Sequence, residues 1–225
     1  MGALSKQVDT QTGGAESVTS LPLEWASLRE WAAANAGLNL SDDQLEQLRA
    51  YVELLQLWNR KMALVSQRDT AELLSKHVAD SLFAAAHCAD REAVADLGSG
   101  AGFPGLPIAI ARPTARVCLI EARGRKASFL EEARRAAAAR NAAVCHSRIE
   151  SLAADPAHRG RYAVVTARAL TSTRELIDLA RPLLAPDGRV IAMRSVGESR
   201  AGEPSTTESI PYRLPDGTPR RLLII

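Results

Sequence analysis

A glycine cluster between an apolar run and a helical segment constrains the fold of this chain most. Residues 93–97 form a short apolar run of the kind found in buried parallel strands, and Gly98-Ser99-Gly100-Ala101-Gly102 follows it directly. Glycines allow a tight turn and let a ligand approach bare backbone at the carboxyl end of the strand. Glycines alone are equally consistent with a plain turn. The strand before them and the helix after them favour a ligand-binding loop.

Further strand-like runs alternate with helical stretches along the rest of the chain. This alternation predicts βαβ units and therefore an α/β fold with a Rossmann-like, doubly wound, mainly parallel sheet. A Pro-Asp-Gly turn is expected at 186–188, and the run 222–225 predicts a further strand at or near an edge. The other expected strands are 116–121, 142–146, 162–167 and 189–193, and the expected helices are 107–111, 126–140 and 172–184.

The chain divides into three parts by composition and pattern. Residues 1–20 are polar and rich in Gly, Ser and Thr, which predicts a disordered tail. Residues 21–90 predict a helical section, and residues 91–225 predict the Rossmann-like core. Within the helical section, Ser41 to Gln44 has the form of a capping box, and a third helical stretch is expected from about 69 to 88.

Composition excludes several classes of protein. The 225 residues include 28 basic and 26 acidic side chains, so a net charge of +2 excludes bulk binding of nucleic acid by a polycation but allows a local basic face. Cys88, Cys118 and Cys145 are scattered, so we expect neither a disulfide nor a metal site, and buried inert thiols at Cys118 and Cys145. With no apolar run of about 18 residues and no signal-peptide pattern, we expect a cytoplasmic protein that does not enter the membrane.

Three features near the glycine cluster indicate the kind of ligand. The spacing is G-x-G-x-G, whereas dinucleotide-binding folds carry G-x-G-x-x-G. Glu121 ends the next strand, where its carboxylate is placed to accept hydrogen bonds from ribose hydroxyls. Asp96 resembles the acid of class I methyltransferases that helps to bind the cationic end of S-adenosylmethionine, and it would repel a pyrophosphate. The pattern favours S-adenosylmethionine as cofactor, with a dehydrogenase as the alternative.

The wider pattern resembles the bacterial small-subunit ribosomal RNA methyltransferase G family, also called glucose-inhibited division protein B. Members of this family make 7-methylguanosine in 16S rRNA. The resemblance extends from about residue 38 to 190, and its pieces keep the order found in the family. These pieces are Trp58-Asn59, His77–Ser81, Asp96–Gly105 with Pro107, Arg125-Lys126 with Phe129-Leu130, Ser147–Glu150 and Arg168-Ala169.

The resemblance and the loop pattern together give the expected site. Carried over position by position, the resemblance implies cofactor contacts at Gly98, Phe103, Ile149, Glu150 and Arg168. The loop pattern adds Asp96, Gly100, Gly102 and Glu121. Contacts with 16S rRNA in the small ribosomal subunit are expected from basic side chains beside the strand ends and in the helical section. These are Arg123, Arg125, Lys126, Arg168, Arg194, Arg60, Lys61 and Arg68.

Simpler roles remain open for some of these residues. Arg60 and Lys61 could be ordinary surface charges at the end of a helix. His77 and Asp80 lie three residues apart on one helix face, where a structural role is about as well supported as a functional one. Trp25, Trp31 and Trp58 are expected in the core. With 4% aromatic residues, a base-stacking platform of the single-strand-binding kind is not expected.

The expected chemistry is transfer of a methyl group to guanine N7. That atom carries a lone pair in the neutral base, so no general base is required and no catalytic residue is assigned. The chain departs from the family at Ala63, where Asn is usual, at Arg194-Ser195, where Lys-Gly is usual, and in a stretch after 195 that looks shortened. An RNA-binding module with little activity and a small-molecule methyltransferase are therefore the alternatives.

Overall fold

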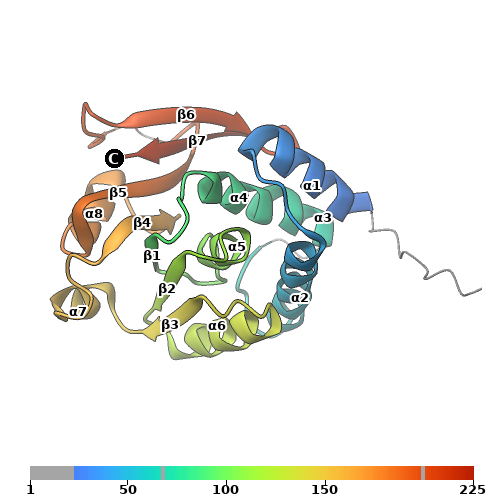
Figure 1. The fold of residues 1–225 in the computed structure, drawn as a ribbon, viewed down its shortest axis with the longest axis horizontal. Helices are drawn as coiled ribbons and strands as arrows, with labels where there is room; N and C mark the ends of the chain where they lie inside the picture. Colours follow the sequence, from blue (N-terminus) through green and yellow to red (C-terminus); the bar gives the residue numbers. More distant parts are fainter. Residues whose placement is uncertain (1–22, 67–68, 199–200) are drawn as a thin grey trace, which may run out of the picture.

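The computed structural model describes residues 23–66, 69–198 and 201–225, which fold around one seven-stranded sheet (Figure 1). The strand order is β3-β2-β1-β4-β5-β7-β6. The first five strands are parallel, and β7 is antiparallel to both of its neighbours. The strands are β1 (Ala93–Leu97), β2 (Arg116–Glu121), β3 (Ala142–His146), β4 (Tyr162–Arg168), β5 (Leu184–Ser195), β6 (Glu208–Arg213) and β7 (Pro219–Ile224).

Helices cover both faces of the sheet. Helices α4, α5 and α6 pack on one face, with α1 and α2 outside them, and the short helices α7 and α8 pack on the other (Figure 1). The helices are α1 (Leu23–Ala36), α2 (Asp42–Asn59), α3 (Thr70–Leu73), the π-helical turn η1 (Leu74–Val78), α4 (Ala79–Ala86), α5 (Gly105–Ala111), α6 (Gly124–Ala136), α7 (Ile149–Ala154) and α8 (Thr173–Ala180).

The predicted α/β fold and its parallel strands are confirmed, because each expected apolar run lies in a strand. Alternation explains why these runs are apolar throughout: Val94 faces the core under α4 to α6, whereas Ala95 faces the core under α7 and α8. The final strand, β7, lies one position in from the edge. Strand β6, which holds the edge, was not predicted, nor was the short helix α7.

The turn expected at 186–188 is wrong, because these residues lie within β5. The register of β5 against β4 shifts there: Tyr162 pairs with Leu184, but Val164 pairs with Arg189. The intervening residues form a bulge. Gly188 fits this bulge because a Cβ there would lie 2.8 Å from the carbonyl oxygen of Tyr162.

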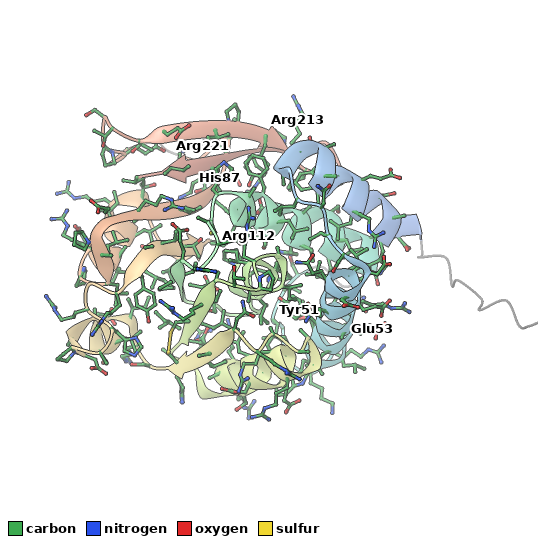
Figure 2. The ribbon with its side chains drawn as sticks, in the orientation of Figure 1. Tyr51, Glu53, His87, Arg112, Arg213 and Arg221 are labelled. Carbon is green, nitrogen blue, oxygen red and sulfur yellow. A yellow bond between two sulfur atoms is a disulfide. The ribbon has the colours of Figure 1, made fainter. Side chains whose placement is uncertain are left out.

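The capping box of α2 is confirmed and fixes where the helix begins. The Gln44 backbone N–H donates to Ser41 Oγ at 3.2 Å, and the Ser41 N–H donates to Gln44 Oε1 at 2.9 Å. The helix then has one apolar and one polar side. Figure 2 shows Glu53 on the outer side of α2 and Tyr51, which is fully buried, on the inner side.

The helical section shares its core with the sheet. One continuous cluster of buried side chains joins α1, α2 and α4 to α5, α6 and one face of the strands. The third helical stretch forms as expected, although its middle is the π-helical turn that carries His77. Trp25 is buried as expected, whereas Trp31 and Trp58 are only partly buried at the margin of the cluster. The expected tail at 1–20 lies outside the described residues.

The expectation of separate thiols at Cys118 and Cys145 is wrong, because a disulfide joins the two residues. They are 27 residues apart in sequence, but they lie on neighbouring strands. Cys118 pairs with Ala143, and Cys145 pairs with Ile120, so the two cysteines are diagonal neighbours on one face with a Cα–Cα distance of 6.4 Å. Cys88 is a buried free thiol, and burial raises its pKa to about 12.

Candidate cofactor-binding site

The glycine loop after β1 has a backbone that favours glycine at three positions. Gly98, Gly100 and Gly102 have φ values of +66°, +57° and +96°, all in the left-handed region. The loop is attached to β2, because the Ser99 N–H donates to the carbonyl of Ile120 at 2.9 Å. The expected loop geometry at the carboxyl end of the first strand is therefore present.

Glu121 connects the end of β2 to this loop. Its carboxylate accepts hydrogen bonds from the backbone N–H of Gly100 at 3.0 Å and from that of Arg123 at 2.8 Å. An ionised carboxylate has about four lone-pair sites, so two sites remain for ligand hydroxyls. The glutamate is only 6% exposed, which fixes its position beside the loop.

A cavity of about 440 Å³ opens at the carboxyl ends of β1 to β4, a volume within the usual range of ligand pockets. It brings together five of the residues expected to bind the cofactor, which come from four separate segments of the chain. These five are Gly98, Glu121, Ile149, Glu150 and Arg168. Arg123 and Lys126, expected to contact RNA, also line it, together with Leu170.

Asp96 ends in a fully buried carboxylate just before the glycine loop and is not part of the cavity lining. Its Oδ2 accepts from the Gly105 N–H at 3.1 Å, whereas its Oδ1 has no hydrogen-bond partner among the described residues. Gly105 permits this approach, because a Cβ there would lie 2.7 Å from Oδ2. Burial raises the pKa of the Asp96 carboxyl to about 7. A buried carboxylate oxygen without a partner fits a cationic ligand group.

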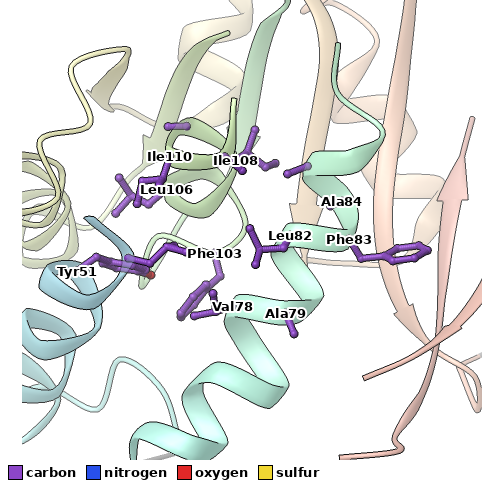
Figure 3. Packing of buried hydrophobic residues seen from close by; sticks show 14 of the residues in the cluster. Tyr51, Val78, Ala79, Leu82, Phe83, Ala84, Phe103, Leu106, Ile108 and Ile110 are labelled. Carbon is purple, nitrogen blue, oxygen red and sulfur yellow. The ribbon is translucent and has the colours of Figure 1, made fainter. Parts of the chain in front are cut away.

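Phe103 sits outside the lining of the cavity and is held by side chains of the helical section (Figure 3). Its ring lies 5.4 Å from that of Tyr51 and is stacked on that of His77 at 5.0 Å, centroid to centroid. Tyr51 also donates a hydrogen bond of 2.6 Å to the carbonyl of Ala101. Burial and the nearby cations lower the pKa of His77 to about 3, so this ring is neutral at physiological pH.

Arg168 joins the cavity to a buried charge cluster around Asp80. Its Nε lies 3.5 Å from Asp80 Oδ2, and its guanidinium lies 5.9 Å from the Phe103 ring centroid. Asp80 also pairs with Arg220 at 2.9 Å and accepts a hydrogen bond from Tyr212. The Nη1 of Arg168 is buried with no hydrogen-bond partner in the described part of the chain. The arginine is thus held through Nε and through Nη2, which donates to the carbonyl of Lys76 at 3.3 Å, and only its Nη1 group remains available.

Tyr51, Tyr212 and Arg220 were missed as parts of this site by sequence reasoning. Tyr51 carried one usable signal, because a tyrosine on the apolar face of a helix must place its hydroxyl against a polar partner. Arg220 is 140 residues from Asp80, and no local pattern links the two.

The expected RNA contacts fall in different places. Arg60, Lys61 and Arg125 lie together at a second cavity, between α2 and α6. Arg194 is buried in β5, where it lies 3.4 Å from Glu198. Its guanidinium is therefore withdrawn from the surface, and we leave it out of the RNA contacts. Arg68 lies outside the described residues.

Neither a membrane-spanning helix nor a metal site is found in the described part of the molecule. No helix there has the length and apolar character that a membrane span needs. No group of three or more His, Cys, Asp or Glu side chains among the described residues is arranged to hold a metal ion.

Comparisons with known structures identify the fold. A methyltransferase from Geobacter sulfurreducens has a TM-score of 0.53 and 15% identity, covering 77% of this chain and 87% of that chain. A SAM dependent methyltransferase from Aquifex aeolicus has a TM-score of 0.52 and 13% identity, covering 70% and 94%. The fold is thus that of class I S-adenosylmethionine-dependent methyltransferases, as the sequence predicted.

Comparisons of sequence identify the family. The family model for rRNA small subunit methyltransferase G matches residues 44–209. Ribosomal RNA small subunit methyltransferase G of Chloroflexus aggregans is 38% identical over 202 residues, covering 84% of each chain. Its counterpart in Stenotrophomonas maltophilia is 39% identical over 176 residues, covering 78% of this chain and 80% of the relative. The cofactor of this protein is S-adenosylmethionine, and the chain belongs to the rRNA small subunit methyltransferase G family.

Proposed function

We propose that this protein transfers a methyl group from S-adenosylmethionine to N7 of a guanine in 16S rRNA. The observation that carries the proposal is the cavity at the glycine loop, where Gly98, Glu121 and Arg168 from three strand ends meet. The relatives named above supply the RNA of the small subunit as substrate class. The choice of guanine N7 rests on the resemblance described under Sequence analysis. We place the enzyme in the cytoplasm, with the small ribosomal subunit as its partner.

The residues around the cavity divide the work of holding the cofactor. We assign Asp96 to its cationic amino group and Glu121 to its ribose hydroxyls, because both carboxylates are fixed by backbone N–H donors. Ile149 and Glu150 follow β3 and suit the adenine. Gly98, which lines the cavity, lets the ligand approach the backbone, and Gly100 and Gly102 allow the positive φ values of the loop. When bound, S-adenosylmethionine would supply a methyl group on a sulfonium sulfur; a nucleophile attacks the methyl carbon in line and the sulfur leaves as a thioether.

On the acceptor side, the protein has to position the guanine base and does not have to remove a proton from it. Guanine N7 has a lone pair in the neutral base, so no side chain has to remove a proton. This suits a site where His77 is neutral and stacked on Phe103. We assign Arg168, whose Nη1 has no hydrogen-bond partner among the described residues, to the acceptor side, and Arg123 and Lys126 to RNA phosphates at the cavity.

The test uses labelled S-adenosylmethionine and 30S particles from a strain that lacks its own enzyme of this kind. We expect label at one guanine, revealed by reduction followed by aniline cleavage. Cofactor binding without transfer to any RNA would favour the first alternative, an RNA-binding module with little activity. That alternative is based on the departure from the family pattern at Arg194-Ser195. Transfer to small molecules alone would favour the other alternative. A protein that does not bind S-adenosylmethionine at all would refute the proposal.

A further inference from the structure

A second cavity lies between the end of α2 and the first turns of α6. Its volume is about 770 Å³, larger than that of the cofactor cavity. Arg125 lines this cavity, whereas its neighbours Arg123 and Lys126 line the cofactor cavity. The two cavities therefore lie on either side of the first turn of one helix.

The wall formed by α2 is apolar and partly open to solvent. It includes Leu54, Leu57 and Trp58 of α2 together with Met62, which follows the helix, and Leu57 is 55% exposed. Trp58 is held in place by α6, because its ring contacts the ring of Phe129 edge-on with a centroid distance of 5.6 Å. The indole N–H of Trp58 donates to Glu132 at 3.3 Å. An aromatic ring and aliphatic side chains are thus presented at a fixed surface.

The rim of the cavity is basic. Arg60, Lys61 and Arg125 are exposed, and within the described residues none of them has an ion pair or a hydrogen bond from its side chain. Other arginines of these helices are paired, Arg49 with Glu53 at 3.0 Å and Arg134 with Glu131 at 2.8 Å, whereas Lys126 of α6 faces the cofactor cavity. Three unpaired cations around an apolar wall favour a ligand that combines a flat apolar group with negative charge.

We propose that this cavity binds an unstacked nucleotide of the RNA substrate, other than the guanine that is methylated. The base would lie against Leu57 and Trp58, and its phosphates would lie among Arg60, Lys61 and Arg125. Unpaired RNA bases are bound in this way, by aromatic faces for the base and cations for the backbone. The inference rests on the proposed RNA substrate. It adds a subsite that anchors the RNA strand beside the cofactor cavity.

The first test compares Leu57→Asp with Leu57→Met in methylation of 30S particles. Leu57 is largely exposed, so neither change should disturb the core. We expect Leu57→Asp to raise the KM for particles by about tenfold or more, because it removes an apolar contact with the base and places a carboxylate near the phosphates, with the Kd for S-adenosylmethionine unchanged. Leu57→Met should behave as the wild type. A KM for Leu57→Asp within twofold of that for Leu57→Met would overturn the inference.

A matched pair of arginine variants tests the basic rim. Arg125→Ala should weaken particle binding and flatten its dependence on salt, because one phosphate contact is lost. Arg116→Ala is the control: this arginine is also exposed and lies at the opposite end of β2 from the cofactor cavity. Equal effects of the two variants would mean that the cavity has no special part in binding.

A third test asks directly whether the occupant is RNA. An unstructured RNA of nine nucleotides should quench part of the tryptophan emission, and the quenching should disappear in Trp58→Phe. Unchanged emission, even if Leu57→Asp weakens particle binding, would indicate a ribosomal protein as the occupant and refute the inference. If the wild type methylates no RNA, the proposed function fails. The emission test still decides whether the cavity binds a nucleotide.

Discussion

Replacing Asp96 with asparagine should separate the cost of burying this carboxylate from its use in binding a cation. Burial raises the pKa of Asp96 from its ordinary value of 3.8 to about 7 in the protein without cofactor. At about 1.36 kcal/mol per pKa unit, ionising this carboxyl costs the folded protein roughly 4 kcal/mol above pH 7. Asparagine has nearly the same shape and cannot ionise, so it removes this cost.

The pH window follows from the direction of the shift. Between about pH 4 and pH 7 the unfolded chain has lost the Asp96 proton and the folded protein has kept it, so stability falls as pH rises. Relative to the wild type, Asp96→Asn should therefore gain roughly 4 kcal/mol of unfolding free energy from pH 4 to pH 8. The fixed cost of burying an amide cancels in this comparison, as does the contribution of His77, which both proteins share.

Urea unfolding of both proteins across this pH range, without cofactor, measures the difference. A difference that stays constant with pH would refute the reasoning. Calorimetric titration gives a second measurement: wild-type affinity for S-adenosylmethionine should rise about tenfold per pH unit between pH 5 and pH 7, because the ionised carboxylate binds the cation. Asp96→Asn should bind weakly, with little change over the same range.

Three further substitutions test other parts of the site. Tyr51→Phe leaves a buried loop carbonyl without its donor and should lower the unfolding free energy by about 1 to 3 kcal/mol in urea titrations, a loss that an unchanged midpoint would contradict. Asp80→Asn removes the buried counter-charge of two partly buried arginines, Arg168 and Arg220, and should cost about 3 kcal/mol in the same assay. Gly98→Val forces a branched residue to a φ of +66° and puts its Cβ 2.7 Å from Leu170 Cδ1, so cofactor binding should be lost while the circular dichroism spectrum stays native. Normal affinity in calorimetry would show that this glycine is not needed.

Much of the sheet was predictable from sequence because its central strands are buried on both faces. Short apolar runs such as 93–97 then have no other stable place in the fold. Strand β6 was missed because it is an edge strand, with Pro211 and alternating polar residues that weaken the pattern. The turn at 186–188 was wrong for a related reason: a Pro-Asp-Gly sequence also fits a bulge, and only the register against β4 distinguishes the two.

The site divides in the same way between local and distant contacts. Gly98, Glu121 and Ile149 were predictable as neighbours because the carboxyl ends of parallel strands meet at one edge of the sheet. The ring stack of His77 on Phe103 and the pairing of Cys118 with Cys145 depend on how separate elements dock, which local spacing does not encode. The disulfide in particular was missed because the two cysteines come together only when β2 and β3 pair.

Helix α2 contacts both the glycine loop of the cofactor site and the second cavity. Tyr51 on its inner side holds the glycine loop, and its last turn forms the wall of the second cavity. If RNA at that wall changes the position or rigidity of the helix, the loop must change with it. By thermodynamic reciprocity, RNA then alters the affinity for S-adenosylmethionine by the same factor as S-adenosylmethionine alters the affinity for RNA. The coupling through α2 would then have the same magnitude whichever substrate binds first. Rates and concentrations alone would decide the order of binding.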